Sequence, residues 1–165
     1  MVYSIAVINQ MDQDDFIETL GEIFEDTPAI AAQAWHKKPF INIEDLHQKM
    51  VDVVTNMDQE EKLALICAHP DLGSKSKMAD ASVQEQASVG LNQLLPKELQ
   101  KFQELNQQYK DKFGFPFIIA VKNYSVSEII SIFIARLDNP KDVEQQQALA
   151  EIFQIASFRL QDIIN

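Results

Sequence analysis

The segment that decides the fold is the last one, Asn139-Pro140 followed by KDVEQQQALAEIFQIASFRLQDII over residues 141–164. Its apolar residues recur mostly at steps of three and four along one side: Val143, Leu149, Ile152, Phe153, Ala156, Leu160 and Ile163. This spacing is typical of an amphipathic α-helix. Proline is favoured in the first turn of a helix, so Asn139-Pro140 is suited to begin it. We therefore predict a long final helix with one buried face.

The same periodicity extends back through the chain. Helix starts are marked by capping residues or by a proline in the first turn at Asp12, Pro28, Asn42, Asp58, Ser82, Pro96 and Ser125. Ser125 and Glu128 have the spacing of a capping box, and the helix that begins at Pro96 is expected to end near Gly114. The pattern predicts an all-α, single-domain bundle of about eight helices over residues 1–165.

One run of residues does not follow the helical pattern. Residues 115–121 read FPFIIAV, which is β-prone, and no second such run is present to pair with it. We predict that this run is a buried extended connector. Its peptide N–H and C=O groups need hydrogen-bond partners, and a bound polar ligand would satisfy some of them.

Composition excludes several classes of function. Lys and Arg total 14 against 25 Asp and Glu, which gives a net charge of −11. A surface of this sign repels phosphate groups, so nucleic acid is not an expected partner. The single cysteine, Cys67, excludes an internal disulfide, and no apolar run approaches the roughly 20 residues of a membrane span. We expect a cytoplasmic protein without membrane association.

His69 is the first candidate for chemistry. It follows the helix that begins at Asp58, and Pro70 disfavours helical geometry at the preceding residue, so His69 is expected on a loop at the end of that helix. Histidine titrates near physiological pH and suits acid–base catalysis. Asp71 and Glu85 are candidates to orient its ring. The alternative is a structural histidine that interacts with the last carbonyl groups of its helix.

Glu85 and Arg159 each have two interpretations as well. Ser82-x-x-Glu85 matches a capping box, in which the carboxylate accepts a hydrogen bond from the Ser82 N–H, but a helix N-terminus also favours a bound anion. Arg159 is in helical register with Ile152 and Ala156, which predicts that it faces inward. There its guanidinium would bind a carboxylate or ureide; otherwise it is a surface cation.

Metal and cofactor sites are not expected. Cys67, His69, Asp71 and Glu85 do not match the common zinc spacings. The chain has no glycine-rich phosphate loop and no Gly-x-Ser-x-Gly nucleophile elbow. Any chemistry is therefore expected to be acid–base chemistry.

Three ordered motifs resemble the family of 2-oxo-4-hydroxy-4-carboxy-5-ureidoimidazoline (OHCU) decarboxylases: His69-Pro70-Asp71-Leu72, Ser82-x-x-Glu85-Gln86 and Phe113-Gly114-Phe115-Pro116-Phe117. The resemblance extends over nearly the whole chain. It implies an all-helical, frequently dimeric carboxy-lyase that needs no cofactor and yields (S)-allantoin from OHCU in urate degradation. A small-molecule substrate and a homodimer are the expected partners.

The resemblance also implies roles for individual residues. By position, His69 is the catalytic acid or base, and Glu85 orients it. Substrate binding is implied for Pro70, Ser82, Gln86, Phe117, Ile118, Ile119 and Arg159. In OHCU the departing carboxylate is next to a ring C=N bond, so the electron pair left behind flows into the substrate and no cofactor is needed as an electron sink.

Two other functions are compatible with the residues alone. A non-catalytic helical interaction module would have no enclosed polar pocket, and loss of His69 would affect only its stability. A hydrolase acting on a related ureide would need a positioned water molecule.

Overall fold

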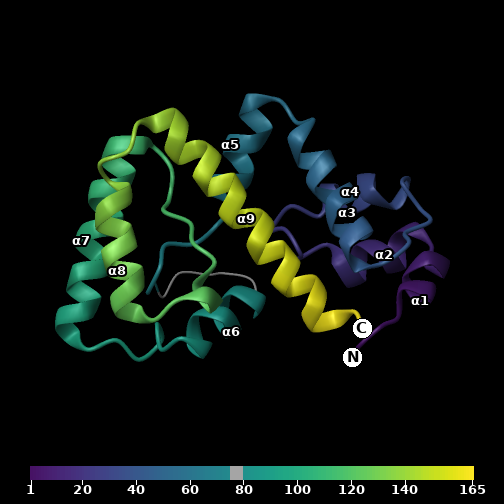
Figure 1. Ribbon diagram of the computed structural model, residues 1–165, viewed down its shortest axis with the longest axis horizontal. Coiled ribbons are helices and arrows are strands. Elements are labelled where there is room, and N and C mark those ends of the chain that lie inside the picture. Colours follow the sequence, from purple (N-terminus) through teal and green to yellow (C-terminus); the bar gives the residue numbers. More distant parts are fainter. Residues whose placement is uncertain (75–79) are drawn as a thin grey trace. The chain divides into compact units, whose positions relative to one another are not determined.

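The computed structural model describes residues 1–74 and 80–165 (Figure 1). Within these residues the chain forms nine α-helices and one 3-10 helix, with a single isolated bridge between Tyr3 and Ile164 in place of a sheet. The prediction of an all-α fold is confirmed. The short N-terminal helix α1 (Ile5–Gln10) is the one that the sequence pattern did not indicate.

The described chain divides into two compact units. The first comprises residues 1–68 and 153–165, and the second residues 69–152. The single domain over residues 1–165 therefore stays a prediction.

The helices of the first unit, after α1, are α2 (Gln13–Leu20), α3 (Ala29–Trp35), α4 (Ile43–Thr55) and α5 (Gln59–Cys67). Those of the second are α6 (Asp80–Ser88), α7 (Pro96–Phe113), the 3-10 helix η1 (Val121–Asn123) and α8 (Val126–Arg136). Helix α9 (Lys141–Ile163) begins in the second unit and ends in the first.

Most helices begin where their capping residues predict. The side chains of Asp12, Asn42 and Asp58 each accept a hydrogen bond from the backbone N–H three residues later, at 2.9, 2.8 and 2.8 Å. Ser125 and Glu128 form the predicted capping box. Helix α7 ends at a left-handed Gly114 with φ of 78°, a conformation that glycine adopts without strain.

Apolar side chains from several helices form the core of the first unit. Helix α2 packs against α3, and α3 against α4. Phe16 and Phe40 stack at a ring distance of 5.9 Å, and Leu20, Leu46 and Met50 are completely buried. Burial of such side chains supplies the main favourable free energy of folding.

An aromatic cluster forms the core of the second unit and encloses the connector. Tyr109 contacts the rings of Phe113, Phe115, Phe117 and Phe133. Phe117 of the connector stacks on Phe133 of α8 with centroids 3.8 Å apart and planes 9° apart. All of residues 115–121 are buried without strand pairing, so the predicted extended connector is confirmed, and it leads directly into η1.

The buried face of α9 differs from the predicted one at its start. Val143 is 44% exposed, whereas Glu144 is 0% and Glu151 8% exposed. The prediction for Val143 is wrong because Glu144 has buried partners that an apolar pattern does not reveal. Those partners lie on α7, on α8 and in the segment before α9.

Candidate active site

His69 lies on a loop, as predicted. Helix α5 ends at Cys67 with Ala68 as its C-cap, and Pro70 follows the histidine. The side chain is not a surface group, because His69 is only 8% exposed. It also has an interaction partner within the protein. Burial on a loop with a fixed backbone is suited to a group that must keep one orientation.

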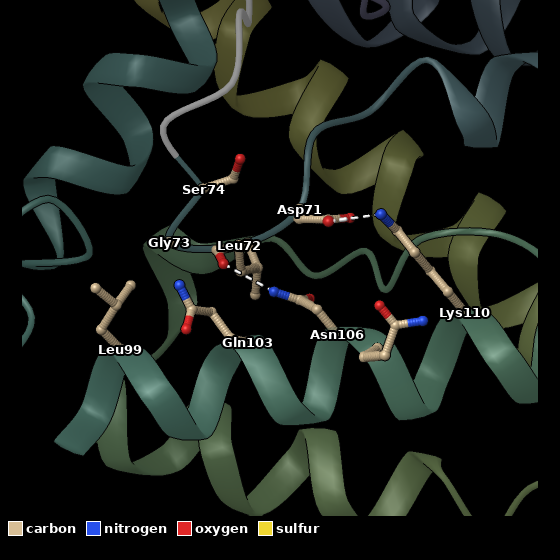
Figure 2. A pocket seen from close by; sticks show the side chains of 9 residues that line it. Asp71, Leu72, Gly73, Ser74, Leu99, Gln103, Asn106 and Lys110 are labelled. Atoms are coloured by element: carbon tan, nitrogen blue, oxygen red, sulfur yellow. Dashed lines mark hydrogen bonds and ion pairs between the residues drawn. The ribbon is translucent and has the colours of Figure 1, made fainter. Parts of the chain in front are cut away.

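Two neutral hydrogen bonds hold the loop that follows His69. The Gly73 N–H donates to Gln86 Oε1 on α6 at 3.1 Å. Asn106 Nδ2 on α7 donates to the Leu72 carbonyl at 3.0 Å (Figure 2). Gly73 has a φ of 69°, so a side chain there would be strained, and its Cβ would lie 3.0 Å from Leu94 Cδ1. The backbone of the loop is therefore fixed from two helices.

Asp71 does not orient the histidine ring. Its Oδ2 lies 2.6 Å from Lys110 Nζ, in a half-exposed ion pair that ties the loop to α7 (Figure 2). Of the two carboxylates proposed as partners for His69, Glu85 is therefore the one that remains a candidate.

A pocket of about 470 Å³ opens on the α7 side of this loop (Figure 2). Its lining is mainly polar: Asp71, Leu72, Gly73, Ser74, Leu99, Gln103, Asn106, Gln107 and Lys110. None of the residues predicted to contact substrate lines it. The pocket adjoins the loop but is not the predicted substrate site.

Helix α6 carries the other predicted polar residues on one face. Ser82, Glu85 and Gln86 are spaced three and four residues apart, so they share a face, and they are 5%, 9% and 8% exposed. Val83, on another face, is 50% exposed. Because α6 buries a polar face and exposes an apolar residue, the buried face has a role other than forming a hydrophobic core.

The start of α6 differs from the prediction. The helix begins at Asp80, so Ser82 lies within the first turn and is not the N-cap. The capping-box interpretation, which needs Ser82 as the N-cap, is therefore wrong.

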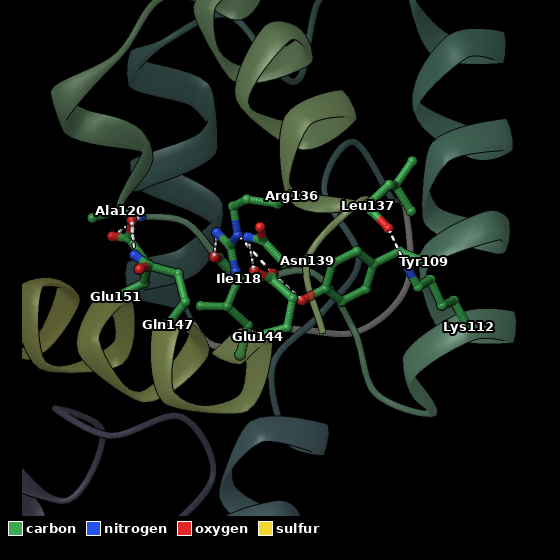
Figure 3. A network of polar contacts seen from close by, with 10 residues as sticks. All are labelled: Tyr109, Lys112, Ile118, Ala120, Arg136, Leu137, Asn139, Glu144, Gln147 and Glu151. Carbon is green, nitrogen blue, oxygen red and sulfur yellow. Dashed lines mark hydrogen bonds and ion pairs between the residues drawn. The ribbon is translucent and has the colours of Figure 1, made fainter. Parts of the chain in front are cut away.

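The connector contributes main-chain groups. The Ile118 carbonyl accepts a hydrogen bond from Arg136 Nη1 at 2.6 Å, and the Ala120 N–H donates to Glu151 Oε2 at 3.2 Å (Figure 3). Ile119 lies between these two anchored groups and is 3% exposed. Within residues 1–74 and 80–165, neither its N–H nor its carbonyl has a hydrogen-bond partner. Ile119 thus carries a buried main-chain donor and acceptor.

Arg159 belongs to the first unit and is 4% exposed, so it faces inward as predicted and is not a surface cation. Its Nη2 donates to Glu25 Oε2 at 2.9 Å. Its Nη1 donates to the carbonyls of Glu22 at 3.0 Å and Ile23 at 3.4 Å. These contacts fix the plane of the guanidinium.

Three buried charged residues of the second unit were not predicted from the sequence: Arg136, Glu144 and Glu151. A signal for the two glutamates was present, because residues 144 and 151 share a helix face with Ala148, Ile152 and Ile155. A carboxylate within an apolar stripe is rarely buried unless it is paired.

Within residues 1–74 and 80–165, no three His, Cys, Asp or Glu side chains are grouped so that they could hold a metal ion. No helix in the same part of the chain is both long enough and apolar enough to cross a membrane.

The second unit therefore contains a buried histidine, a buried carboxylate, two neutral polar side chains, and a main-chain donor and acceptor that have no partner among the residues that the structure describes. Groups of these kinds suit an acid–base enzyme that acts on a small polar molecule. A family profile described as OHCU decarboxylase matches residues 9–161. The chain belongs to the OHCU decarboxylase family.

Individual relatives agree with this assignment. A 2-oxo-4-hydroxy-4-carboxy-5-ureidoimidazoline decarboxylase of Halalkalicoccus jeotgali is 42% identical over 97% of this chain and 91% of its own length. The uric acid degradation bifunctional protein PucL of Bacillus subtilis is 45% identical over 99% of this chain, which spans 33% of that protein. The crystal structure of an (S)-allantoin synthase matches with a TM-score of 0.76 at 26% identity, over 98% of this chain and 54% of that one.

Proposed function

We propose that this protein is a cofactor-independent decarboxylase that converts OHCU to (S)-allantoin in urate degradation. The observation that carries the proposal is a family match over residues 9–161 that includes a buried His69 and the buried polar face of α6. The names of the relatives and of the matching structure support the same substrate and product. Family membership does not support the alternative of a non-catalytic interaction module.

The reaction breaks one bond and moves three protons. The bond between the ring carbon and the carboxylate breaks, CO₂ leaves, and the electron pair moves through the adjacent C=N bond to its nitrogen, which takes up a proton from solvent. His69, oriented by Glu85, accepts the proton of the substrate hydroxyl as that group becomes a carbonyl. A proton then reaches the neighbouring ring carbon from one side, which sets the (S) configuration. Acid–base assistance of this kind typically contributes about 10²–10⁴-fold to the rate.

The remaining residues hold the substrate. Ser82 and Gln86 bind its polar groups beside Glu85, and Pro70 restricts the backbone next to His69. The main chain of residues 117–119 binds the ring, for which the buried donor and acceptor of Ile119 are suited. Arg159 binds a carboxylate or ureide of the substrate, and the support for this role is its buried guanidinium held by Glu25.

Substitution of the two acid–base residues tests the proposal. OHCU is generated from urate immediately before use, and chiral allantoin is followed by circular dichroism together with CO₂ release. His69→Asn and Glu85→Gln, which keep the approximate shape of each side chain, are expected to lower kcat by about 100-fold or more. Wild-type rates in both variants would exclude the mechanism. Release of ammonia or urea in place of CO₂ would indicate a ureide hydrolase.

The family resemblance also leads us to propose a cytoplasmic homodimer. Light scattering on the purified chain should then give twice the monomer mass of 18.8 kDa. A monomer at the concentrations used for the assay would exclude a dimeric enzyme.

A further inference from the structure

We propose that Arg136 and Glu151 are positioning residues that fix the two peptide planes on either side of Ile119. This inference rests on the proposed function, because it explains how the connector presents its main chain to an amide-containing substrate. Neither residue belongs to the three sequence motifs of the family resemblance.

Arg136 anchors the peptide plane before Ile119. Its Nη1 donates to the Ile118 carbonyl at 2.6 Å. Its guanidinium carbon lies 4.3 Å from the centre of the Phe117 ring, an additional cation–π contact with the connector. A planar guanidinium can make both contacts at once, whereas a lysine ammonium has no such fork. Arg136 therefore fixes two successive residues of the connector.

Glu144 keeps Arg136 in place. Arg136 Nε donates to Glu144 Oε1 at 2.7 Å, and the pair is almost completely buried. Tyr109 Oη donates to the same oxygen at 2.5 Å, and Asn139 Nδ2 donates to Glu144 Oε2 at 2.9 Å. Figure 3 shows Arg136, Asn139 and Tyr109 converging on this carboxylate. A buried charge with this many donors has a single orientation.

Glu151 anchors the peptide plane after Ile119. Its Oε2 accepts the Ala120 N–H at 3.2 Å, and its Oε1 accepts a hydrogen bond from Gln147 Nε2 at 3.4 Å (Figure 3). Glu151 is 8% exposed, so burial in the core limits the movement of its carboxylate.

The two anchors determine where the main-chain groups of Ile119 point. In a planar trans peptide the C=O and N–H groups point in opposite directions. Holding the Ile118 carbonyl therefore directs the Ile119 N–H away from Arg136. Holding the Ala120 N–H likewise directs the Ile119 carbonyl away from Glu151. A donor and an acceptor fixed on one residue are complementary to an amide or ureide, which offers a carbonyl and an N–H.

Such anchoring has a kinetic consequence. Displacement of a binding group by about 1 Å can lower the rate by about 10²-fold, even when the substitution is remote from the reacting atoms. If one peptide plane is released, the loss should appear in substrate binding and in kcat/KM. A residue that only supports the fold would change the unfolding temperature and leave the kinetics of the folded fraction unchanged.

The test compares Glu151→Leu with Glu151→Gln in the full chain, using the same OHCU assay. Leucine removes the acceptor for the Ala120 N–H, whereas the glutamine amide retains a carbonyl oxygen for it. We expect Glu151→Leu to raise KM and to lower kcat/KM by about 10–100-fold, with Glu151→Gln within about threefold of the wild type. Calorimetry with (S)-allantoin should show the same order of affinities, and Arg136→Lys should resemble Glu151→Leu.

Each outcome is decisive. Unchanged KM and (S)-allantoin affinity in Glu151→Leu, with a wild-type circular dichroism spectrum, would exclude the positioning role. An equal loss in Glu151→Gln would also exclude it, because the acceptor is retained. If Glu151→Leu does not fold, KM and the (S)-allantoin affinity are measured for Arg136→Lys, and unchanged values would exclude the positioning role. A wild-type protein that releases no CO₂ from OHCU would instead overturn the proposed function.

Discussion

Two buried arginine–glutamate pairs stabilise different parts of this molecule. Arg136 and Glu144 pair at 2.7 Å in the second unit, and Arg159 and Glu25 pair at 2.9 Å in the first. Both pairs are nearly inaccessible to solvent. They differ in the further groups to which each pair is hydrogen-bonded. Side chains from two further segments donate to Glu144, whereas Arg159 makes its other described contacts with main-chain carbonyls.

The difference shows how a buried ion pair is made tolerable. Removing two charges from water is costly unless further hydrogen bonds compensate. In the Arg136 pair, the further hydrogen bonds come from Tyr109 and Asn139, so the pair joins several elements and fixes the connector. In the Arg159 pair, the further hydrogen bonds go to main-chain carbonyls just after α2, so the pair fixes one guanidinium. The first arrangement is expected to contribute more to stability than the second.

Loss of either carboxylate should have the largest effect on stability. Glu144→Leu leaves the Arg136 charge buried and removes the acceptor of Tyr109 and Asn139, so we expect a loss of about 3–5 kcal/mol in the free energy of unfolding. Glu25→Leu should cost less, because Arg159 keeps two carbonyl acceptors. Urea denaturation of the two variants measures both values. A larger loss in Glu25→Leu would contradict the comparison.

Tyr109→Phe tests the Glu144 network without removing a charge. The substitution deletes one hydrogen bond to a buried carboxylate and leaves the aromatic ring in the cluster. A hydrogen bond to a charged group contributes about 1.5–3 kcal/mol, and we expect a loss in that range. Thermal unfolding of the variant beside the wild type measures the change. A loss equal to that of Glu144→Leu would mean that the tyrosine hydrogen bond, and not the ion pair, contributes most of the stability that the network supplies.

The same residue gives the protein a dependence on alkaline pH. Burial, and next the hydrogen bond to Glu144, raise the pKa of Tyr109 above its ordinary value of 10.0. The unfolded chain loses this proton near pH 10 while the folded protein retains it. The contribution of Tyr109 is therefore complete below that pH and is lost as pH rises toward the folded-state pKa. Urea denaturation above pH 10 should show a steeper loss of stability in the wild type than in Tyr109→Phe.

The exposed pair between Lys110 and Asp71 should have the smallest effect. Their side chains are 44% and 27% exposed, so water and salt screen the attraction. Lys110→Met is expected to change the free energy of unfolding by less than about 1 kcal/mol, and the difference should shrink in high salt. Denaturation at low and high ionic strength measures it. A loss as large as that of Glu25→Leu would remove the distinction between buried and exposed pairs.

Predictions from local sequence were correct for features that depend on a single short segment of the chain. The caps at Asp12, Asn42, Asp58 and Ser125 each depend on a side chain and a backbone group only three residues apart. Burial of Arg159 was also predictable, because its helical register places it with apolar residues. The prediction for Ser82 failed because α6 already includes Asp80 and Ala81, so the serine lies inside the helix.

The roles of Arg136, Glu144 and Glu151 required the tertiary structure. Arg136 and Ile118 are 18 positions apart, and Tyr109 and Glu144 are 35 apart. The pattern of apolar residues predicts that a glutamate is exposed. Burial of the glutamate becomes favourable only when hydrogen-bond donors from other elements surround it. Asp71 shows the converse, since its proximity to His69 in sequence suggested a contact that Lys110 replaces.

The sequence by itself determined the helical class, most helix starts, the extended connector and the family. These depend on period, caps and motifs that are encoded within short stretches of chain. Only the tertiary structure decided that Arg136, Glu144 and Glu151 are buried and that the main-chain groups of Ile119 stay unpaired within the described part of the chain. The physical reason is that the cost of burying a charge or a peptide group depends on its partners, and those partners come from distant segments.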